Sequence, residues 1–260
     1  MFWALTTDLV NTRGHEFEHV LGDIQTLNNW ARAARLEVTA LSLAAYPFVQ
    51  EDYVLLPHGA SIGSGYGPIV VALGSLTREE LSRTEIVVPG TMTTSYLALR
   101  LVLGEFRFRE LAFDQIPEEV ASGRAEAGLL IHEGQLTFED YGLVKVLDLG
   151  EWWLLETGLP LPLGVTVARR DLGRSALREV SEVLRDAIQC GLDNRAEALE
   201  YAIQFGRGID AAVADRFVSM YVNELTKDYG DEGRKAVTEL LRRGETLGAF
   251  PGPVQIDFVS

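Results

Sequence analysis

The sequence predicts an α/β protein built from two lobes with a ligand-binding cleft between them. Three observations support this. Short apolar runs alternate with stretches whose apolar residues recur at helical spacing. Two segments rich in glycine or proline, Ser61–Gly67 and Thr157–Gly164, interrupt that alternation as crossings between domains would. The apolar run Gly128–Ile131 has the length and polar flanks of a buried parallel strand, and it ends at His132.

His132 is the leading candidate for a functional side chain. In open α/β sheets, ligands bind outside the carboxyl ends of the strands, and His132 follows such an end. Histidine also has an unperturbed pKa suited to proton transfer near neutral pH. The alternative is a histidine at a strand end that only hydrogen-bonds a loop.

The elements before the first crossing alternate between strands and helices. Partial alternation predicts a strand at residues 16–21, and Asp23 is a good N-cap for the helix that follows. A short strand at residues 37–41 leads into a helix that opens at Ser42. A further strand is expected at residues 53–56.

The first crossing has three glycines in five positions, Gly63 to Gly67, but it is a weak phosphate-loop signal. A phosphate loop opens a helix, whereas Pro68 and a strand at residues 69–73 follow here. A flexible connection between lobes fits better.

The central block repeats strand and helix. A surface helix is expected at residues 76–82, strands at 85–88 and 106–113, a helix at 117–122, the strand that ends at His132, a strand at 144–147 and a helix from Glu151. Thr93 and Thr94 lie where a helix begins, and free N–H groups at such a start can bind an anion. Simple capping by threonine is the alternative.

The second crossing is predicted to lead into a strand at residues 165–168, and the remainder is helical. This gives a discontinuous first lobe, residues 1–75 and 165–260, and an inserted second lobe, residues 76–164. Ser42 from the first lobe should face the same cleft as Thr93, Thr94 and His132.

Composition narrows the partners to a small-molecule substrate. The formal net charge of −15 disfavours nucleic acid and anionic membranes, which select basic surfaces.

One cysteine, Cys190, excludes an intramolecular disulfide framework. No apolar run approaches a membrane span, and no leader peptide is visible, so we expect a cytoplasmic protein. The oligomeric state is left open.

Two catalytic motifs are rejected. His15 to His19 matches H-E-x-x-H, but zinc binding requires a helix, and this segment is predicted to be a strand with no third ligand downstream. We therefore expect no metal site. A hydrolase triad of Ser42, His132 and Asp148 lacks the G-x-S-x-G elbow.

Several segments together resemble 1,4-dihydroxy-6-naphthoate synthase of the futalosine route to menaquinone. The resemblance runs in order over nearly the whole chain and is carried by residues 23–28, 41–46, 67–71, 89–94, 127–133, 149–153, 157–164, 221–223 and 233–236. It implies a type II periplasmic-binding-protein-like fold. It also implies a lyase, without metal or organic cofactor, that converts cyclic dehypoxanthinylfutalosine to 1,4-dihydroxy-6-naphthoate and dihydroxyacetone.

The resemblance assigns roles to particular residues. The family's catalytic histidine lies in the same Ile-His-Glu context, so His132 is expected to be the general base. Two substrate-binding segments correspond to Ala40-Leu41-Ser42 and to Thr93-Thr94.

Two departures from the family pattern stand out. Ala40 takes the place of the family's usual lysine, which would remove a positive contact to an anionic substrate. The family's first strand and Ser-Pro-Cys-Pro-Asn-Asp loop are not seen before Met1, so the expectation is that the chain as written lacks its true beginning. The alternative functions are a non-catalytic solute-binding protein of the same fold and the sister enzyme chorismate dehydratase.

Overall fold

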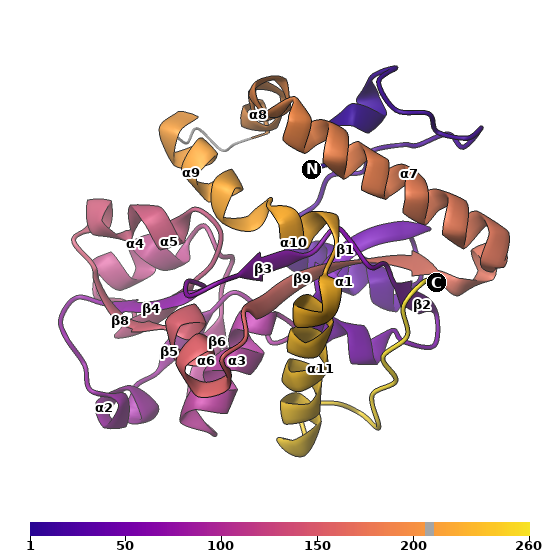
Figure 1. The fold of residues 1–260 in the computed structure, drawn as a ribbon. Helices are drawn as coiled ribbons and strands as arrows, with labels where there is room; N and C mark the ends of the chain where they lie inside the picture. The colour runs from indigo at the N-terminus through magenta and orange to yellow at the C-terminus, as the bar shows by residue number, and fades with distance from the viewer. Residues whose placement is uncertain (206–210) are drawn as a thin grey trace.

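The computed structural model describes residues 1–205 and 211–260 and contains two β-sheets with helices packed on both (Figure 1). In the first sheet three strands pair antiparallel with the same long strand, β9. Its members are β1 (Val38–Ser42), β2 (Tyr53–Leu55), β3 (Ser61–Gly63) and β9 (Leu161–Arg169).

The second sheet has the strand order β6-β5-β7-β4-β8. Strand β5 runs parallel to both β6 and β7, whereas β4 runs antiparallel to β7 and β8. The strands are β4 (Ile69–Ala72), β5 (Ile86–Val88), β6 (Phe108–Glu110), β7 (Ala127–Leu130) and β8 (Val144–Asp148). As a result, the chain leaves β5, β6 and β7 at the same edge of the sheet.

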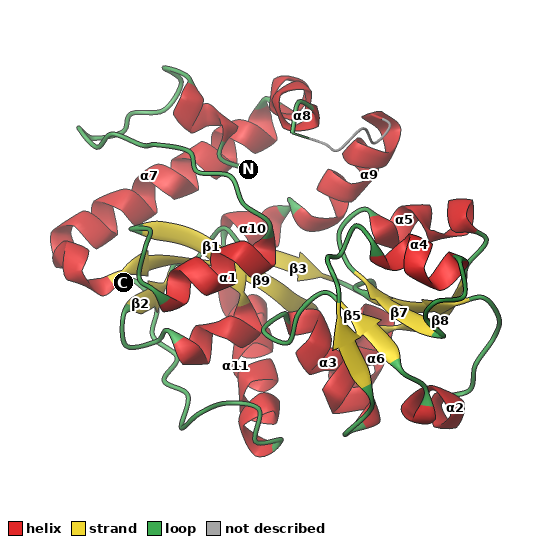
Figure 2. Cartoon of the chain, turned by 180° about the vertical axis from the view of Figure 1, so that it is seen from behind, coloured by secondary structure: helices red, strands yellow, loops and turns green. Residues whose placement is uncertain are grey.

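Helices cover both faces of each sheet, with α7 and α11 on opposite sides of the first sheet (Figures 1 and 2). The α-helices are α1 (Ile24–Arg32), α2 (Arg78–Arg83), α3 (Thr94–Leu103), α4 (Ile116–Ala121), α5 (Gly134–Thr137), α6 (Leu149–Thr157), α7 (Gly173–Asp193), α8 (Arg195–Ile203), α9 (Ala211–Tyr221), α10 (Glu224–Lys227) and α11 (Gly230–Thr246). Short 3₁₀ helices are η1 (Trp3–Thr6), η2 (Leu43–Phe48), η3 (Phe138–Tyr141) and η4 (Arg170–Leu172). No helix in the described ranges is both long enough and apolar enough to span a bilayer.

Side-chain caps fix several helix starts where the sequence predicts them. Asp23 accepts a hydrogen bond from the Thr26 amide and begins α1, and this hydrogen bonding lowers the pKa of the Asp23 carboxyl although its partial burial acts the other way. Thr77 and Glu80 form a reciprocal capping box at α2. The predicted helix at Ser42 is instead the 3₁₀ helix η2, which contains Pro47.

The two connections between the sheets pair with each other. Strand β3 leads into β4, and the first half of β9 returns from α6, so that Ile62 lies opposite Pro162 and Gly63 opposite Leu161. The sequence predicted that the strand after the second crossing starts at residue 165, whereas β9 starts four residues earlier, at Leu161. Proline lacks a backbone donor, and Pro162 is tolerated because the register shifts between Ser61 and Ile62.

The predicted strand at residues 16–21 is wrong, because this segment has no regular secondary structure. It lies on α7 through side chains, with Phe17 packed beside Val180 and Leu184. Val20 and Leu21 are 40% and 65% exposed, so the alternation of residue types does not define a buried face.

Candidate functional site

The carboxyl edge of the second sheet brings together residues that are far apart in the sequence. Gly90, Phe113 and His132 follow β5, β6 and β7, which are adjacent parallel strands. The rings of Phe113 and His132 meet in a T-shaped arrangement, with centroids 4.8 Å apart. This ring contact joins residues that follow the two strands on either side of β5.

His132 itself has an unusual backbone conformation. Its φ of 54° lies in the left-handed region, which it shares with only Arg13 and Ala34 among the described non-glycine residues. Such a conformation costs about 1–3 kcal/mol and persists where neighbouring groups hold it. The His132 carbonyl accepts a hydrogen bond from the Gln135 amide at 3.2 Å, which closes the turn that begins α5.

Helix α9 supplies the other side of this site. Figure 2 shows α9 beside α5, above the second sheet. The ring of Phe217 lies edge-on to His132 with centroids 6.3 Å apart, and one turn later Tyr221 packs against Phe217 at 5.0 Å. Tyr66, at the first crossing, packs against Tyr221 at 5.6 Å. His132 therefore contacts aromatic rings from two different segments, and Tyr221 and Tyr66 extend this aromatic cluster away from it.

A buried hydrogen bond links α9 to the His132 turn. The Tyr221 hydroxyl donates to Oε1 of Gln135 at 2.7 Å, and both side chains are buried. Burial raises the pKa of Tyr221 well above its ordinary value, so the hydroxyl is a neutral donor at physiological pH. The sequence analysis missed Gln135, Phe217 and Tyr66 as site residues. The sequence signal that could have indicated this part of the site is the aromatic pair Phe217 and Tyr221, spaced one helical turn apart.

The hydroxyls of Thr93 and Thr94 have internal partners. Thr93 caps α3 by accepting from the Tyr96 amide, and its hydroxyl also lies 2.7 Å from the Gly90 carbonyl. The Thr94 hydroxyl donates to the Leu163 carbonyl at 2.6 Å and accepts from the Ala44 amide at 3.1 Å. Thr94 thus connects α3 to both β9 and η2.

The segment Ala40-Leu41-Ser42 lies at the end of β1 beside this junction. Ala40 is exposed, whereas Leu41 and Ser42 are buried. The buried Asn28 side chain accepts from the Ser42 amide at 2.8 Å and donates to the Ser42 hydroxyl at 3.1 Å. Since the Ala44 amide binds Thr94, the two predicted substrate-binding segments are close in space.

The rejected motifs have structural partners instead of catalytic ones. His15 lies 3.1 Å from Glu179 on α7. In the ranges that the structure describes, no group of three or more His, Cys, Asp or Glu side chains is placed to hold a metal. Asp148 caps α6 by accepting from the Gly150 and Glu151 amides, and it also pairs with Lys145.

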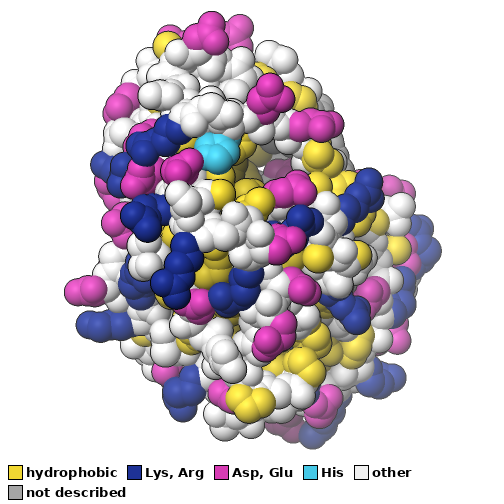
Figure 3. Space-filling view, turned by 90° about the vertical axis from the view of Figure 1, so that its right-hand side faces the viewer, with side chains coloured by type: hydrophobic (Ala, Val, Ile, Leu, Met, Phe, Trp, Pro, Cys, Tyr) yellow, Lys and Arg dark blue, Asp and Glu magenta, His cyan; other side chains and the backbone are white. Residues whose placement is uncertain are grey.

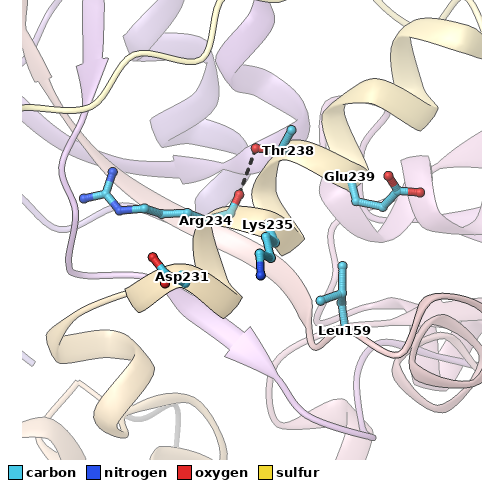
Figure 4. A pocket seen from close by; sticks show the side chains of 6 residues that line it. All are labelled: Leu159, Asp231, Arg234, Lys235, Thr238 and Glu239. Carbon is cyan, nitrogen blue, oxygen red and sulfur yellow. Dashed lines mark hydrogen bonds between the residues drawn. The ribbon is translucent and has the colours of Figure 1, made fainter.

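An open hollow of about 520 Å³ lies elsewhere, on α11 (Figure 4). Its lining mixes two cations and two carboxylates: Asp231, Arg234, Lys235 and Glu239, with Leu159 and Thr238. Arg234 stacks on the ring of Phe258 at 4.3 Å, and Glu239 is held by Arg242 and Arg243. This hollow contains none of the predicted site residues and no excess of positive charge for an anion.

The exposed charge is also mixed on the face seen in Figure 3, where basic side chains lie among acidic ones. Ion pairs such as Arg13–Glu182 and Arg170–Asp257 join partly exposed side chains of opposite charge.

The two crossing segments and the candidate site at a sheet edge define an α/β protein of periplasmic-binding-protein architecture. Solved structures of this architecture superpose over most of the chain. The ligand-binding component of an ABC-type import system from Staphylococcus aureus has a TM-score of 0.71 at 14% identity and covers 98% of this chain and 90% of its own. A Candida albicans protein described as having the generic periplasmic binding protein fold has a TM-score of 0.69 at 13% identity, with 98% and 88% covered. At such identities the likeness establishes the fold, and it confirms the predicted fold class.

Closer relatives establish the family. A family model described as menaquinone biosynthesis matches residues 1–246. Proteins named 1,4-dihydroxy-6-naphthoate synthase are 44% identical in Thermus thermophilus and 37% identical in Streptomyces coelicolor, each covering 91% of this chain and 86% of the relative. The crystal structure of an Archaeoglobus fulgidus protein has 42% identity and a TM-score of 0.91, with 96% and 93% covered. The chain belongs to the menaquinone biosynthesis family, and the predicted resemblance to 1,4-dihydroxy-6-naphthoate synthase is confirmed, as is the prediction of an enzyme.

Proposed function

We propose that this protein is a lyase that converts cyclic dehypoxanthinylfutalosine to 1,4-dihydroxy-6-naphthoate and dihydroxyacetone in the cytoplasm, acting as a biosynthetic enzyme without a cofactor. The observation that carries the proposal is the placement of His132. It lies at the carboxyl edge of the second sheet in a left-handed turn, between the rings of Phe113 and Phe217. The relatives named as naphthoate synthases support the substrate class.

The proposed chemistry needs a base held next to a planar product. Breaking a carbon–carbon bond in the spiro-fused sugar portion requires removal of a proton, and formation of the aromatic naphthoate drives the step. The imidazole of His132 takes the proton. The surrounding rings exclude water and offer apolar faces to the bicyclic ring system.

Thr93, Thr94 and the segment Ala40-Leu41-Ser42 form the proposed substrate-binding part of the site. Because the Thr93 and Thr94 hydroxyls already have protein partners, the contribution of this region would come mainly from backbone N–H groups at the start of α3.

The test is turnover of the purified protein with the cyclic futalosine derivative, followed by mass spectrometry of both products. His132→Gln should lower kcat by about 10²–10⁴-fold, the usual contribution of a general base. His19→Gln is the matched control, since His19 is exposed and outside the site. Binding of the substrate without turnover by the wild type would instead indicate a solute-binding protein. Near-wild-type kcat in His132→Gln would overturn the assignment of the base.

A further inference from the structure

We propose that Gln135 and Tyr221 are positioning residues that hold His132 in its working geometry. The expected effect on catalysis rests on the proposed function, whereas the positioning of His132 rests on hydrogen bonds within this chain. The Tyr221 hydroxyl binds the Gln135 side chain, and the Gln135 backbone binds the His132 carbonyl. Gln135 therefore connects α9 directly to the histidine turn.

The first link of this connection is the turn itself. The amide of Gln135 donates to the His132 carbonyl at 3.2 Å, and the amides of Leu136 and Thr137 donate to the Glu133 carbonyl at 2.8 and 3.2 Å. Helix α5 has only four residues, from Gly134 to Thr137. A helix of one turn is not stable alone, so its position depends on contacts from elsewhere.

The second link supplies such a contact. Only 8% of Gln135 and 5% of Tyr221 are exposed, so the hydrogen bond between them is shielded from water. If the donor were lost, Oε1 of Gln135 would remain buried without a partner, and the favoured response is movement of the side chain and of the short helix that carries it. The left-handed backbone of His132 adjoins that helix, so such movement would reach the imidazole.

The third link fixes Tyr221. Its ring is packed by Tyr66 and Phe217, and its carbonyl accepts a buried hydrogen bond from the Thr226 hydroxyl at 2.9 Å. Phe217 also contacts the His132 ring. Helix α9 thus holds the histidine in two ways, through the ring of Phe217 and through the hydroxyl of Tyr221.

The activity test compares two tyrosine hydroxyl deletions. Tyr221→Phe should lower kcat by about 10- to 100-fold, as expected for small misplacement of a reacting group, while KM changes less than about threefold. Tyr53→Phe is the matched control, because Tyr53 is a fully buried tyrosine whose hydroxyl donates to the Leu36 carbonyl at 2.6 Å in the first sheet. It should lose stability without losing kcat.

A double variant tests whether the bond, and not either side chain alone, is responsible. Gln135→Met removes the acceptor and keeps a similar volume. If the two groups act as one unit, kcat of the double variant Gln135→Met/Tyr221→Phe should be no lower than that of the worse single variant. Multiplied losses would contradict the proposal.

A readout without turnover separates this proposal from the proposed function. The ¹H–¹³C signals of the four histidine rings can be assigned by single His→Gln variants. In Tyr221→Phe the His132 signal should shift, since ring currents of Phe113 and Phe217 report its position, and in Tyr53→Phe it should not. An unchanged His132 signal in both Tyr221→Phe and Gln135→Met would overturn the positioning role. Absence of wild-type turnover, with the signal shifted, would overturn only the proposed reaction.

Discussion

At the scale of single residues, several polar side chains near the candidate site already have two partners within the fold. Thr94 is the clearest case, since its hydroxyl joins the Ala44 amide to the Leu163 carbonyl and the residue is 2% exposed. Ser42 is similar, with both its amide and its hydroxyl bound by Asn28. We propose that a residue of this kind affects substrate binding through the backbone that it holds.

Thr94→Val should therefore destabilise the protein. Valine matches the shape of threonine but leaves a buried amide and a partly buried carbonyl unpaired, at about 1–3 kcal/mol for a fully buried group. Thr94→Ser, which keeps the hydroxyl, should recover most of the loss. Urea unfolding of the three proteins measures the effect. Unchanged stability in Thr94→Val with a raised KM would show that the hydroxyl contacts substrate instead.

His58 should make stability depend on pH. The side chain is 3% exposed beside Ser181, and burial, followed by repulsion from Arg185, lowers its pKa from 6.5 to about 4. The folded state therefore keeps His58 neutral, while the unfolded state takes up a proton below about pH 6.5. The free energy of unfolding should fall by about 3 kcal/mol from this group as the pH drops from 6.5 to 4.

Urea unfolding at pH 7.5 and pH 5 checks this expectation. His58→Gln should lose clearly less stability between the two pH values than the wild type does. His19→Gln, at an exposed position, should keep the wild-type dependence. Equal pH dependence in wild type and His58→Gln would contradict the account.

At the scale of elements, close backbone contacts decide how the second sheet meets its covering helices. A Cβ added at Gly150, near the start of α6, would lie 2.0 Å from the carbonyl carbon of Tyr66. One added at Gly67 would lie 2.8 Å from the Gly150 amide nitrogen. Two glycines thus allow the first crossing to pass directly over α6, which sets the position of Tyr66 beside Tyr221.

Gly150→Ala should separate these two elements. Overpacking of this kind costs about 1–3 kcal/mol or more, and movement of Tyr66 should also lower activity. Gly74→Ala is the control, because a Cβ there meets nothing within 4 Å. The Tm from thermal unfolding and kcat should both fall in Gly150→Ala and stay unchanged in Gly74→Ala. Wild-type Tm in Gly150→Ala would show that the backbone can move apart freely.

Sequence patterns predicted elements well where local chemistry is decisive. Asp23 marks the start of α1, and the short apolar run before His132 is a strand. The error at residues 16–21 arose because alternation of residue types does not reveal whether a backbone has a pairing partner. The bond between Tyr221 and Gln135 joins residues 86 positions apart, and such a contact follows only from the packing of α9 on the sheet edge.

At the scale of the whole molecule, we propose that residues 1–75 with 165–260 and residues 76–164 are the two lobes. They share one apolar cluster of buried residues, which includes Leu41 and Val165 of the first lobe and Ile86 and Leu129 of the second. Helices α3 and α11 contribute Leu97 and Leu241 to it. A continuous core of this kind couples the lobes energetically, because exposure of one lobe removes apolar contacts from the other.

The last prediction is that both lobes unfold in one transition. Trp30 on α1 reports on the first lobe, and Trp153 on α6 reports on the second. Trp153 is fully buried and donates to the Pro160 carbonyl at 3.0 Å. Two variants that each retain one of these tryptophans, with phenylalanine at the other three, allow each lobe to be followed by fluorescence. In each variant the fluorescence and far-ultraviolet circular dichroism midpoints in urea should coincide. A Trp153 transition clearly separated from the circular dichroism of the same variant would show that the inserted lobe unfolds by itself. The shared cluster would then be too weak to couple the unfolding of the two lobes.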